Sequence, residues 1–378
     1  MADSIDKSVT DTKTTVEIPG AEEVIQEQKE QIEKVQSDGG PVEIEMDDQG
    51  GAEISFDPNA ATPEGGEEHF SNLAEFLDDG ILSELAQNLS DKYTEYKESR
   101  SDWEQSYREG LDLLGFKYQR RTQPFRGASS VTHPVLAEAV AQFQATAYKE
   151  LLPSDGPVRT QILGDVTAPK QDQANRVKDF MNYQLMDQMK EYEPEFDQML
   201  FYLPLTGSTF KKVYYDDLLG RAVSKFVHSD DLVVPYSATS LEDAEAVVHV
   251  IKMSENELRK QQVSGFYKDI DLGEPPVVEN QLTEKKQELE GITQNGQEDM
   301  YTLLEFHIDL DLEGYEDVNP EDGEPTGIKV PYIVTVDTAN TEILSIRRNY
   351  QAEDPLKKKI NYFVQFKFLP GTGFYGFG

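Results

Sequence analysis

The chain has 378 residues, of which 72 are Asp or Glu and 35 are Lys or Arg, so its formal net charge at pH 7 is −37. This charge argues against a protein that binds the nucleic-acid backbone, because such affinity comes mainly from clustered Lys and Arg. The absence of cysteine excludes disulfides, thiolate metal sites and a cysteine nucleophile. The sequence contains neither an apolar run of about 18 residues nor a basic-then-apolar N-terminus, so we expect no membrane span and no signal peptide.

The first 70 residues differ in composition from the rest of the chain. They hold 19 acidic and 4 basic residues, whereas the remaining 308 hold 53 and 31 and nearly all the aromatic residues. A segment of low hydrophobicity and high like charge cannot bury enough apolar area to offset its chain entropy. We therefore predict a disordered acidic tail over residues 1–70, with at most a transient helix from Glu22 to Val35.

Residues 71–115 show a helical pattern of apolar positions. Leu73, Phe76 and Leu77 share one face, Gly80 interrupts the pattern, and a leucine stripe then resumes at steps of three and four residues. A further stripe consists of Trp103, Tyr107, Leu111 and Leu114. Stripes of this kind usually face a core, and we interpret the only tryptophan as a core anchor.

Residues 123–153 admit two interpretations. Ser129 or Ser130 beside His133 has the residue types of a nucleophile and its base, but no neighbouring residue would orient that base. Alternatively, Pro134 lies in the first turn of a helix that Thr132 or His133 caps. The following apolar positions form one continuous face: Leu136, Ala139, Val140, Phe143, Ala147, Tyr148 and Leu151. We favour the helix start.

The second half of the chain changes from helical to strand-like patterns. A helix is predicted over residues 171–193, with Ala174, Val177, Met181, Leu185 and Met189 on its apolar side. Past Pro194 we predict strands, beginning with a hairpin of residues 210–215 and 222–227. Ser254 and Glu257 form a capping box for a helix over residues 254–267. The remaining predicted strands cover residues 301–313, 328–336, 343–350 and 360–368. The predicted class is α+β, with helices followed by a mixed, mostly antiparallel region.

The strand at 301–313 carries weak candidates for a metal site. Alternation places His307, Asp309 and Asp311 on one face, at a spacing that could hold a divalent ion. A half-buried antiparallel strand shows the same alternation with a solvated outer face, and we favour that interpretation. Asp230-Asp231 is more typical of a turn than of a metal site. His69, His228 and His249 stand isolated in the sequence.

Two further motifs carry weak signals. Arg347 and Arg348, together with Lys357, Lys358 and Lys359, are the only neighbouring basic clusters and the candidates for weak DNA contact. Gly371, Gly373 and Gly376 match a dinucleotide-binding spacing, but the strand-to-helix context of that motif is missing. We therefore predict no catalytic residue and no cofactor.

Several stretches, taken in their order and spacing, resemble the portal proteins of short-tailed double-stranded DNA bacteriophages. Six stretches carry this resemblance: DWEQSYREGLDLLGF (102–116), PFRGASSVTHPVLAEAVAQFQATAYKELLP (124–153), ANRVKDFMNYQLM (174–186), DQMLFYLPLTGSTFKKVYYD (197–216), DDLVVPYSATSLEDAEAVVHVIKMSENELRK (230–260) and FKFLPGTGFYGFG (366–378). The resemblance covers about residues 80–378. The stretches are packing and assembly motifs, so they imply architecture and not chemistry.

The resemblance implies a non-enzymatic subunit of a dodecameric ring at a capsid vertex in the virion, assembled in the host cytoplasm. DNA would pass through the channel without tight binding, driven by the terminase large subunit, while capsid or scaffolding protein and tail adaptors dock around the ring. Residues 71–195 and 196–378 would be the helical and strand-rich parts of the portal wing. The apolar end at Gly378 leads us to expect a longer polypeptide.

Two other functions remain as alternatives. One is an acidic virion scaffold or adaptor protein that binds other virion proteins. The other is a metal-dependent hydrolase that would use His307, Asp309 and Asp311.

Overall fold

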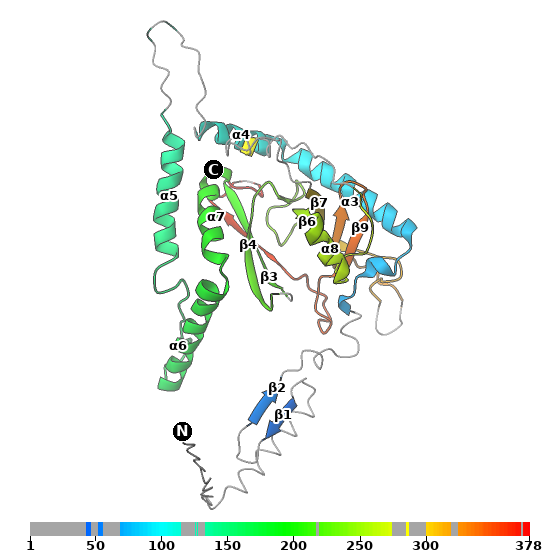
Figure 1. Cartoon of the computed structure of the whole chain (residues 1–378), viewed down its shortest axis with the longest axis horizontal. Coiled ribbons are helices and arrows are strands. Elements are labelled where there is room, and N and C mark those ends of the chain that lie inside the picture. Colours follow the sequence, from blue (N-terminus) through cyan, green and yellow to red (C-terminus); the bar gives the residue numbers. More distant parts are fainter. Residues whose placement is uncertain are drawn as a thin grey trace, which may run out of the picture. The chain divides into compact units, whose positions relative to one another are not determined.

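The structure is a computed structural model of the chain, and Figure 1 shows its course. It describes residues 43–46, 52–55, 69–114, 125, 127, 133–216, 219–273, 285–286, 300–318, 324–371 and 373–378. The chain divides into two units, Met1–Phe70 and Ser71–Gly378. No helix in the described part is long and apolar enough to cross a membrane.

In the first unit the structure describes one short antiparallel hairpin, which the sequence analysis did not predict. Strand β1 (Glu43–Met46) pairs with β2 (Ala52–Ser55). Apart from His69 and Phe70, the rest of the predicted tail lies outside the described residues, and so does the predicted transient helix at 22–35.

The second unit confirms the predicted α+β class, since helices are followed by antiparallel sheets. The helical part consists of η1 (Leu73–Glu75), α3 (Asp79–Ser99), α4 (Ser101–Leu113), α5 (Val135–Leu151), α6 (Ala168–Tyr183), the π-helical turn η2 (Gln184–Gln188) and α7 (Tyr192–Thr206). Helix α8 (Glu255–Val263) lies within the strand-rich part, and the predicted capping box of Ser254 and Glu257 is present at its start.

Helix α3 packs along the larger of the two sheets in this unit, and Gly80 belongs to the first turn of the helix instead of interrupting the pattern. The Asp78 side chain accepts a hydrogen bond of 2.8 Å from the Gly80 amide and so caps the helix. Leu82, Ala86 and Leu89 are buried on the inner face. The prediction for Phe76 was wrong, because this side chain is 67% exposed; the chain there is a short 3-10 turn, which breaks the α-helical spacing.

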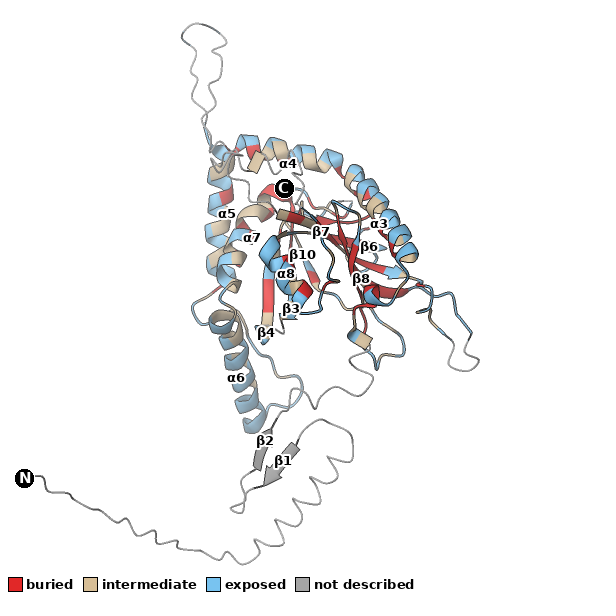
Figure 2. Cartoon of the chain, turned by 45° about the vertical axis from the view of Figure 1, so that its right-hand side comes forward, coloured by how far each residue is buried: buried red, intermediate tan, exposed pale blue. Residues whose placement is uncertain are grey.

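The larger sheet has five antiparallel strands in the order β5-β6-β7-β8-β9. Their bounds are Leu232–Val233, Ala246–Ser254, Met300–Leu310, Val330–Asp337 and Ile343–Arg348. One face packs on α3, through residues such as Val248, Phe306 and Val334. In the colours of Figure 2 these strands are largely buried.

The smaller sheet has the order β10-β3-β4, with β3 at Ser208–Asp216, β4 at Arg221–Val227 and β10 at Phe363–Lys367. The predicted hairpin of β3 and β4 is present, and Asp216 pairs with Arg221 beside the turn. This sheet contributes Phe210, Val227 and Phe363 to a cluster that includes Val247 of the larger sheet. The larger sheet is therefore covered on its second face as well.

Helix α7 corrects the prediction that strands begin after Pro194. The helix runs to Thr206, beyond the boundary expected at residue 195. Pro194 lies in the first turn, where a missing amide proton costs no helical hydrogen bond. Helix α7 packs against both α5 and the smaller sheet, so more than one of its sides is apolar. Phe196, Met199 and Leu200 belong to one core cluster there.

Helix α5 confirms the preferred interpretation of residues 123–153 in its main feature. The helix begins at Val135, with Pro134 at the N-cap position and no side-chain cap, so the expected cap by His133 is wrong. Thr132 lies outside the described residues. Val140 is buried against Tyr107, Leu111 and Leu114 of the α4 stripe, which confirms that stripe as a core face. His133 is exposed. Ser129 and Ser130 lie outside the described residues.

Candidate functional site

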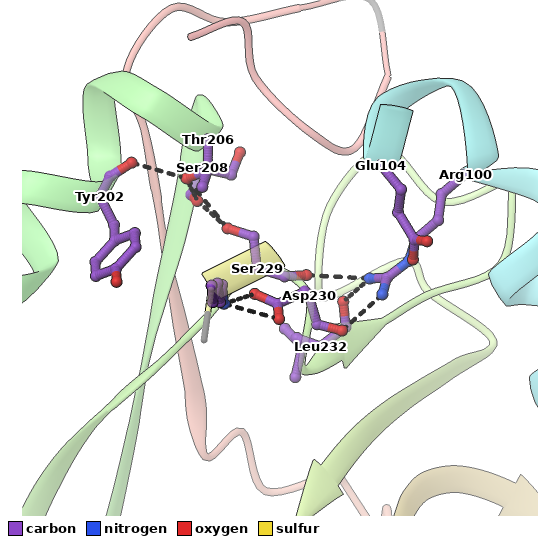
Figure 3. A network of polar contacts seen from close by, with 9 residues as sticks. Arg100, Glu104, Tyr202, Thr206, Ser208, Ser229, Asp230 and Leu232 are labelled. Atoms are coloured by element: carbon purple, nitrogen blue, oxygen red, sulfur yellow. Dashed lines mark hydrogen bonds and ion pairs between the residues drawn. The ribbon is translucent and has the colours of Figure 1, made fainter. Parts of the chain in front are cut away.

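A buried polar network is centred on Arg100, at the junction between α3 and α4 (Figure 3). The guanidinium donates to the carbonyl oxygens of Ser229 (3.0 Å), Asp230 (2.6 Å) and Leu232 (2.9 Å). It also donates to Glu104 (2.9 Å) and to the Tyr375 hydroxyl (3.0 Å). Because the side chain is almost fully buried, each of these bonds replaces water that Arg100 would otherwise bind.

The turn that Arg100 holds is anchored on its other side too. Both Asp230 carboxylate oxygens accept hydrogen bonds of 2.9 Å from Lys286 Nζ. The Ser229 hydroxyl donates to the Ser208 carbonyl at the start of β3 (Figure 3). Asp230 and Asp231 thus form the turn that the sequence analysis favoured over a metal site.

Electrostatic contacts at this site favour the charged forms of Arg100 and Asp230. Burial opposes the charged form of Arg100, but its contacts with Tyr375 and Glu104 outweigh burial and raise its pKa above the ordinary value. Burial likewise opposes ionisation of Asp230, but Lys286 outweighs it and lowers the pKa of this carboxyl. Burial and the neighbouring Asp230 charge raise the pKa of Asp231. Arg100 and Asp230 therefore hold chain segments together in their charged forms, whereas the carboxyl of Asp231 is shifted towards its neutral form.

A cleft of about 650 Å³ lies beside Arg100, lined by α4, the end of α7, residues 234–236 and the segment 373–378. The Trp103 ring stacks on Tyr375 with centroids 4.6 Å apart, and its indole nitrogen donates to the Thr206 carbonyl at 3.2 Å. Asp102 is the only carboxylate among the described lining residues. The cleft can hold an apolar or aromatic group, but this lining supplies no pair of acid and base for catalysis.

A second polar cluster lies between the two sheets. Lys212 of β3 donates to both carboxylate oxygens of Glu305 on β7, at 2.6 and 2.8 Å. His307 Nε2 lies 2.8 Å from Glu305 Oε1, and His249 Nδ1 lies 3.7 Å from the same oxygen. Glu305 and His249 are directly opposite each other in the register of β6 and β7. The three groups therefore share one buried carboxylate.

Burial determines the protonation states of this cluster. Burial lowers the pKa of both His249 and His307, although their contacts with Glu305 act in the opposite direction. Burial alone would raise the pKa of Glu305, but Lys212 and the two histidines lower it well below its usual value. The void beside His307 measures only about 10 Å³. This is room for one water at most, so the cluster cannot admit a substrate.

The weak metal candidates are not brought together as a site. His307 is only 2% exposed, whereas Asp309 and Asp311 are exposed to solvent. The solvated-face interpretation of His307 is also wrong, because the smaller sheet covers this part of β7. The interpretation of His249 as isolated is wrong for the same reason. In the described part of the chain, no group of three or more His, Asp or Glu side chains is placed to hold a metal ion.

The basic candidates for DNA contact do not form one patch. Arg347 and Arg348 are consecutive on β9 and so point to opposite faces of the sheet. The Arg347 guanidinium lies 4.4 Å from the Phe266 ring centroid and donates to the Phe266 carbonyl, whereas Arg348 lies over Tyr315. Lys357 forms an ion pair with Asp317. Burial lowers the pKa of Lys359.

The glycine-rich end packs against the body and does not form a nucleotide loop. Gly376 approaches Gly207 so closely that a Cβ on Gly376 would lie 2.4 Å from the Gly207 carbonyl oxygen. Phe374 stacks on Phe210 with centroids 5.7 Å apart. Gly207 and Gly376 therefore permit close backbone packing at the end of α7.

Sequence reasoning missed the residues that build both polar sites, namely Arg100, Tyr375, Lys212, Glu305 and Lys286. Arg100 was readable only as a polar residue between two helical patterns. Glu305 was readable only as one polar residue on an alternating strand. The sequence does show that Glu305 and His307, two residues apart, share one face of a strand. Their partner His249 reaches them only through the pairing register of β6 and β7.

The chain matches no protein-family model, and no curated protein sequence is detectably similar to it.

Proposed function

We propose that this chain is a structural subunit of a phage portal ring, through which double-stranded DNA is packaged and ejected. The proposal starts from the ordered set of sequence stretches that resemble short-tailed phage portals. These stretches lie in different helices and strands, and most have no chemical motif of their own. The α+β fold, with helices over 79–206 followed by antiparallel sheets, agrees with the expected wing region.

One observation supports the proposal most directly: five of the six resembling stretches, all but 174–186, meet at a single packed junction. Trp103 of the first stretch stacks on Tyr375 of the last and bonds to Thr206 of the fourth. Val140 of the second stretch packs on Tyr107 and Leu111. Arg100, two residues before the first stretch, bonds to the start of the fifth at Asp230. Such convergence is expected of residues selected for architecture.

The proposed partners follow from this role. Other copies of the chain would form a dodecameric ring, terminase would dock on the ring during packaging, and tail adaptor proteins would bind after it. Double-stranded DNA would pass through the channel of the ring without tight binding. The metal-dependent hydrolase is not proposed, because His307 is buried away from Asp309 and Asp311.

The decisive experiment is electron microscopy of the purified protein at micromolar concentration. We expect closed rings, with twelve subunits in the dominant class. Particles without cyclic symmetry, together with a monomeric mass in native mass spectrometry, would overturn the proposal. If that monomer bound capsid protein tightly, the acidic scaffold or adaptor would become the better description.

A further inference from the structure

Helix α6 presents an apolar face that the described part of the chain does not cover. Val177, Phe180, Met181 and Tyr183 are 45%, 58%, 43% and 50% exposed, and no residue of α6 is buried. Figure 2 shows α6 in the colours of exposed and intermediate residues along its length. The spacing of these residues is that of a packed helix, and the sequence analysis predicted a packed face here.

The helix is anchored on one side, so its exposed face is held in a defined place. The Asn182 side chain bonds to both backbone groups of Val158, at 2.9 and 3.3 Å. The Thr160 hydroxyl donates to the Ala174 carbonyl at 3.1 Å. At Gly156 a Cβ would lie 2.4 Å from Asn182, so that glycine permits the close approach. The segment 156–160 thus fixes α6 and leaves the Val177 and Phe180 side free.

The charge around α6 differs from that of the rest of the protein. Residues 157–190 contain five basic and four acidic residues and no glutamate, a net charge of +1, against −22 for residues 71–378 as a whole. Interface cores are enriched in aromatic residues, Met and Arg and depleted in Glu and Asp. The exposed face of α6 has this composition, with Phe180, Met181, Tyr183 and Arg176.

A second copy of this chain supplies a complementary surface. The outward side of α3 is acidic, with Glu84, Asp91, Glu95 and Glu98 all exposed. Two copies that each carry a net charge of −22 repel each other. This repulsion is weakest where the region around α6, with its net charge of +1, faces the other copy. Since α6 and this acidic surface are different parts of the chain, a contact between them would be head-to-tail, the kind that closes into rings.

We infer that the exposed face of α6, centred on Val177, Phe180 and Met181, is a contact with a neighbouring copy of this chain. The inference rests on the proposed ring function, and it names the surface through which copies join. A contact of this kind excludes water from the apolar stripe and places Arg176 against carboxylates of the neighbour.

The test compares assembly of the wild-type chain with that of the V177D/F180D variant by analytical ultracentrifugation. The matched control is V263D, because Val263 is an exposed apolar residue of α8 with 76% exposure. We expect V177D/F180D to raise the concentration for half-assembly by about tenfold or more, as loss of central interface residues does. V263D should leave assembly unchanged, and thermal unfolding should show that both variants remain folded.

A second measurement uses the absence of cysteine. A single cysteine introduced by Q173C, on the same stripe of α6, would carry a solvent-sensitive dye, and V263C would be the control. We expect the α6 dye alone to report burial as the protein assembles. Intact rings in V177D/F180D with an unchanged dye signal would overturn the inference and leave the ring function standing. Assembly into dimers or open chains with the α6 dye buried would support the inference and overturn the ring. A wild-type chain that stays monomeric would overturn both.

Discussion

Lys212 on β3 and Glu305 on β7 form an ion pair of 2.6 Å that joins the two sheets of the protein. Both side chains are largely buried, at 15% and 13% exposure. Breaking a buried pair leaves an uncompensated charge, which costs far more than the pair itself contributes. The relationship therefore makes the contact between the sheets sensitive to either residue alone.

We predict that Lys212→Met lowers the free energy of unfolding by about 3–5 kcal/mol. Chemical denaturation followed by circular dichroism measures this. Arg259→Met is the control, because its ion pair with Asp269 is well exposed and should contribute less than about 1 kcal/mol. The double variant Lys212→Met/Glu305→Leu should recover part of the loss, since no charge is then left unpaired. Equal effects of Lys212→Met and Arg259→Met would contradict this account.

We predict that the protein loses stability as the pH falls below about 6.5, the ordinary pKa of histidine. Burial lowers the pKa of His249 and His307 in the folded state, so the unfolded chain takes up protons first. Stability contributed by the neutral histidines is thus present above the unfolded pKa and is lost as the pH falls towards the folded values. Thermal midpoints measured from about pH 7 to about pH 5 test this.

The controls for that titration are the variants His249→Asn and His307→Asn. Their midpoints should fall less steeply with pH than that of the wild type. His228 also titrates in the acid range, because burial lowers its pKa to about 4, so His228→Asn separates its contribution. The positive charges of Lys212, Lys225 and Lys359 also lower the pKa values of the two histidines, whereas Glu305 raises them. A parallel pH dependence in all variants would argue against the cluster as the source.

We predict that Arg100→Lys destabilises the protein nearly as much as Arg100→Met, by about 3 kcal/mol or more. An ammonium group is a single nitrogen with three donors and no planar fork. It could at best replace the bonds of Nη1, and it would lose those that Nε and Nη2 donate to Glu104 and Asp230. Denaturant midpoints measure the effect. A mild loss in Arg100→Lys would show that charge alone, and not the directed bonds, holds the turn.

We predict opposite outcomes for substitutions on the two sides of the α5 start. Val140→Asp should abolish soluble protein, because Val140 is 2% exposed and a buried unpaired charge is very costly. Replacing Ser129 and Ser130 together by Ala should leave assembly intact. Expression, solubility and ring formation measure both. The reverse ranking would revive the nucleophile interpretation of Ser129, Ser130 and His133.

We predict no stable duplex DNA binding at about 0.15 M salt, where charges are screened beyond about 8 Å. The net charge repels a polyanion, and Arg347 and Lys357 are engaged within the protein. Electrophoretic shift with a short duplex measures this. A sub-micromolar shift that disappears when Arg347, Arg348 and Lys357 to Lys359 become Ala would contradict the prediction. The protein would then be a DNA-binding module.

The sequence by itself determined the local elements, because apolar spacing and capping chemistry act over a few residues. The stripe of Tyr107 and Leu111, the hairpin of β3 and β4 and the capping box at Ser254 were all readable in this way. Residues near Pro194 were misread, because a helix packed on several sides lacks the amphipathic period that marks a surface helix.

Only the tertiary structure decided which faces are covered. Alternation along β7 shows that its two faces differ in polarity, but a second sheet over His307 and Glu305 leaves no mark on that pattern. Apart from Glu104, the partners of Arg100 lie more than 100 residues away in the chain. Strand register alone brings His249 to Glu305. At α6 the spacing of Val177 and Met181 predicts a buried face, but the described residues leave this face exposed. Local periodicity reports that a face can be buried, whereas the long-range arrangement of layers determines whether it is and by what.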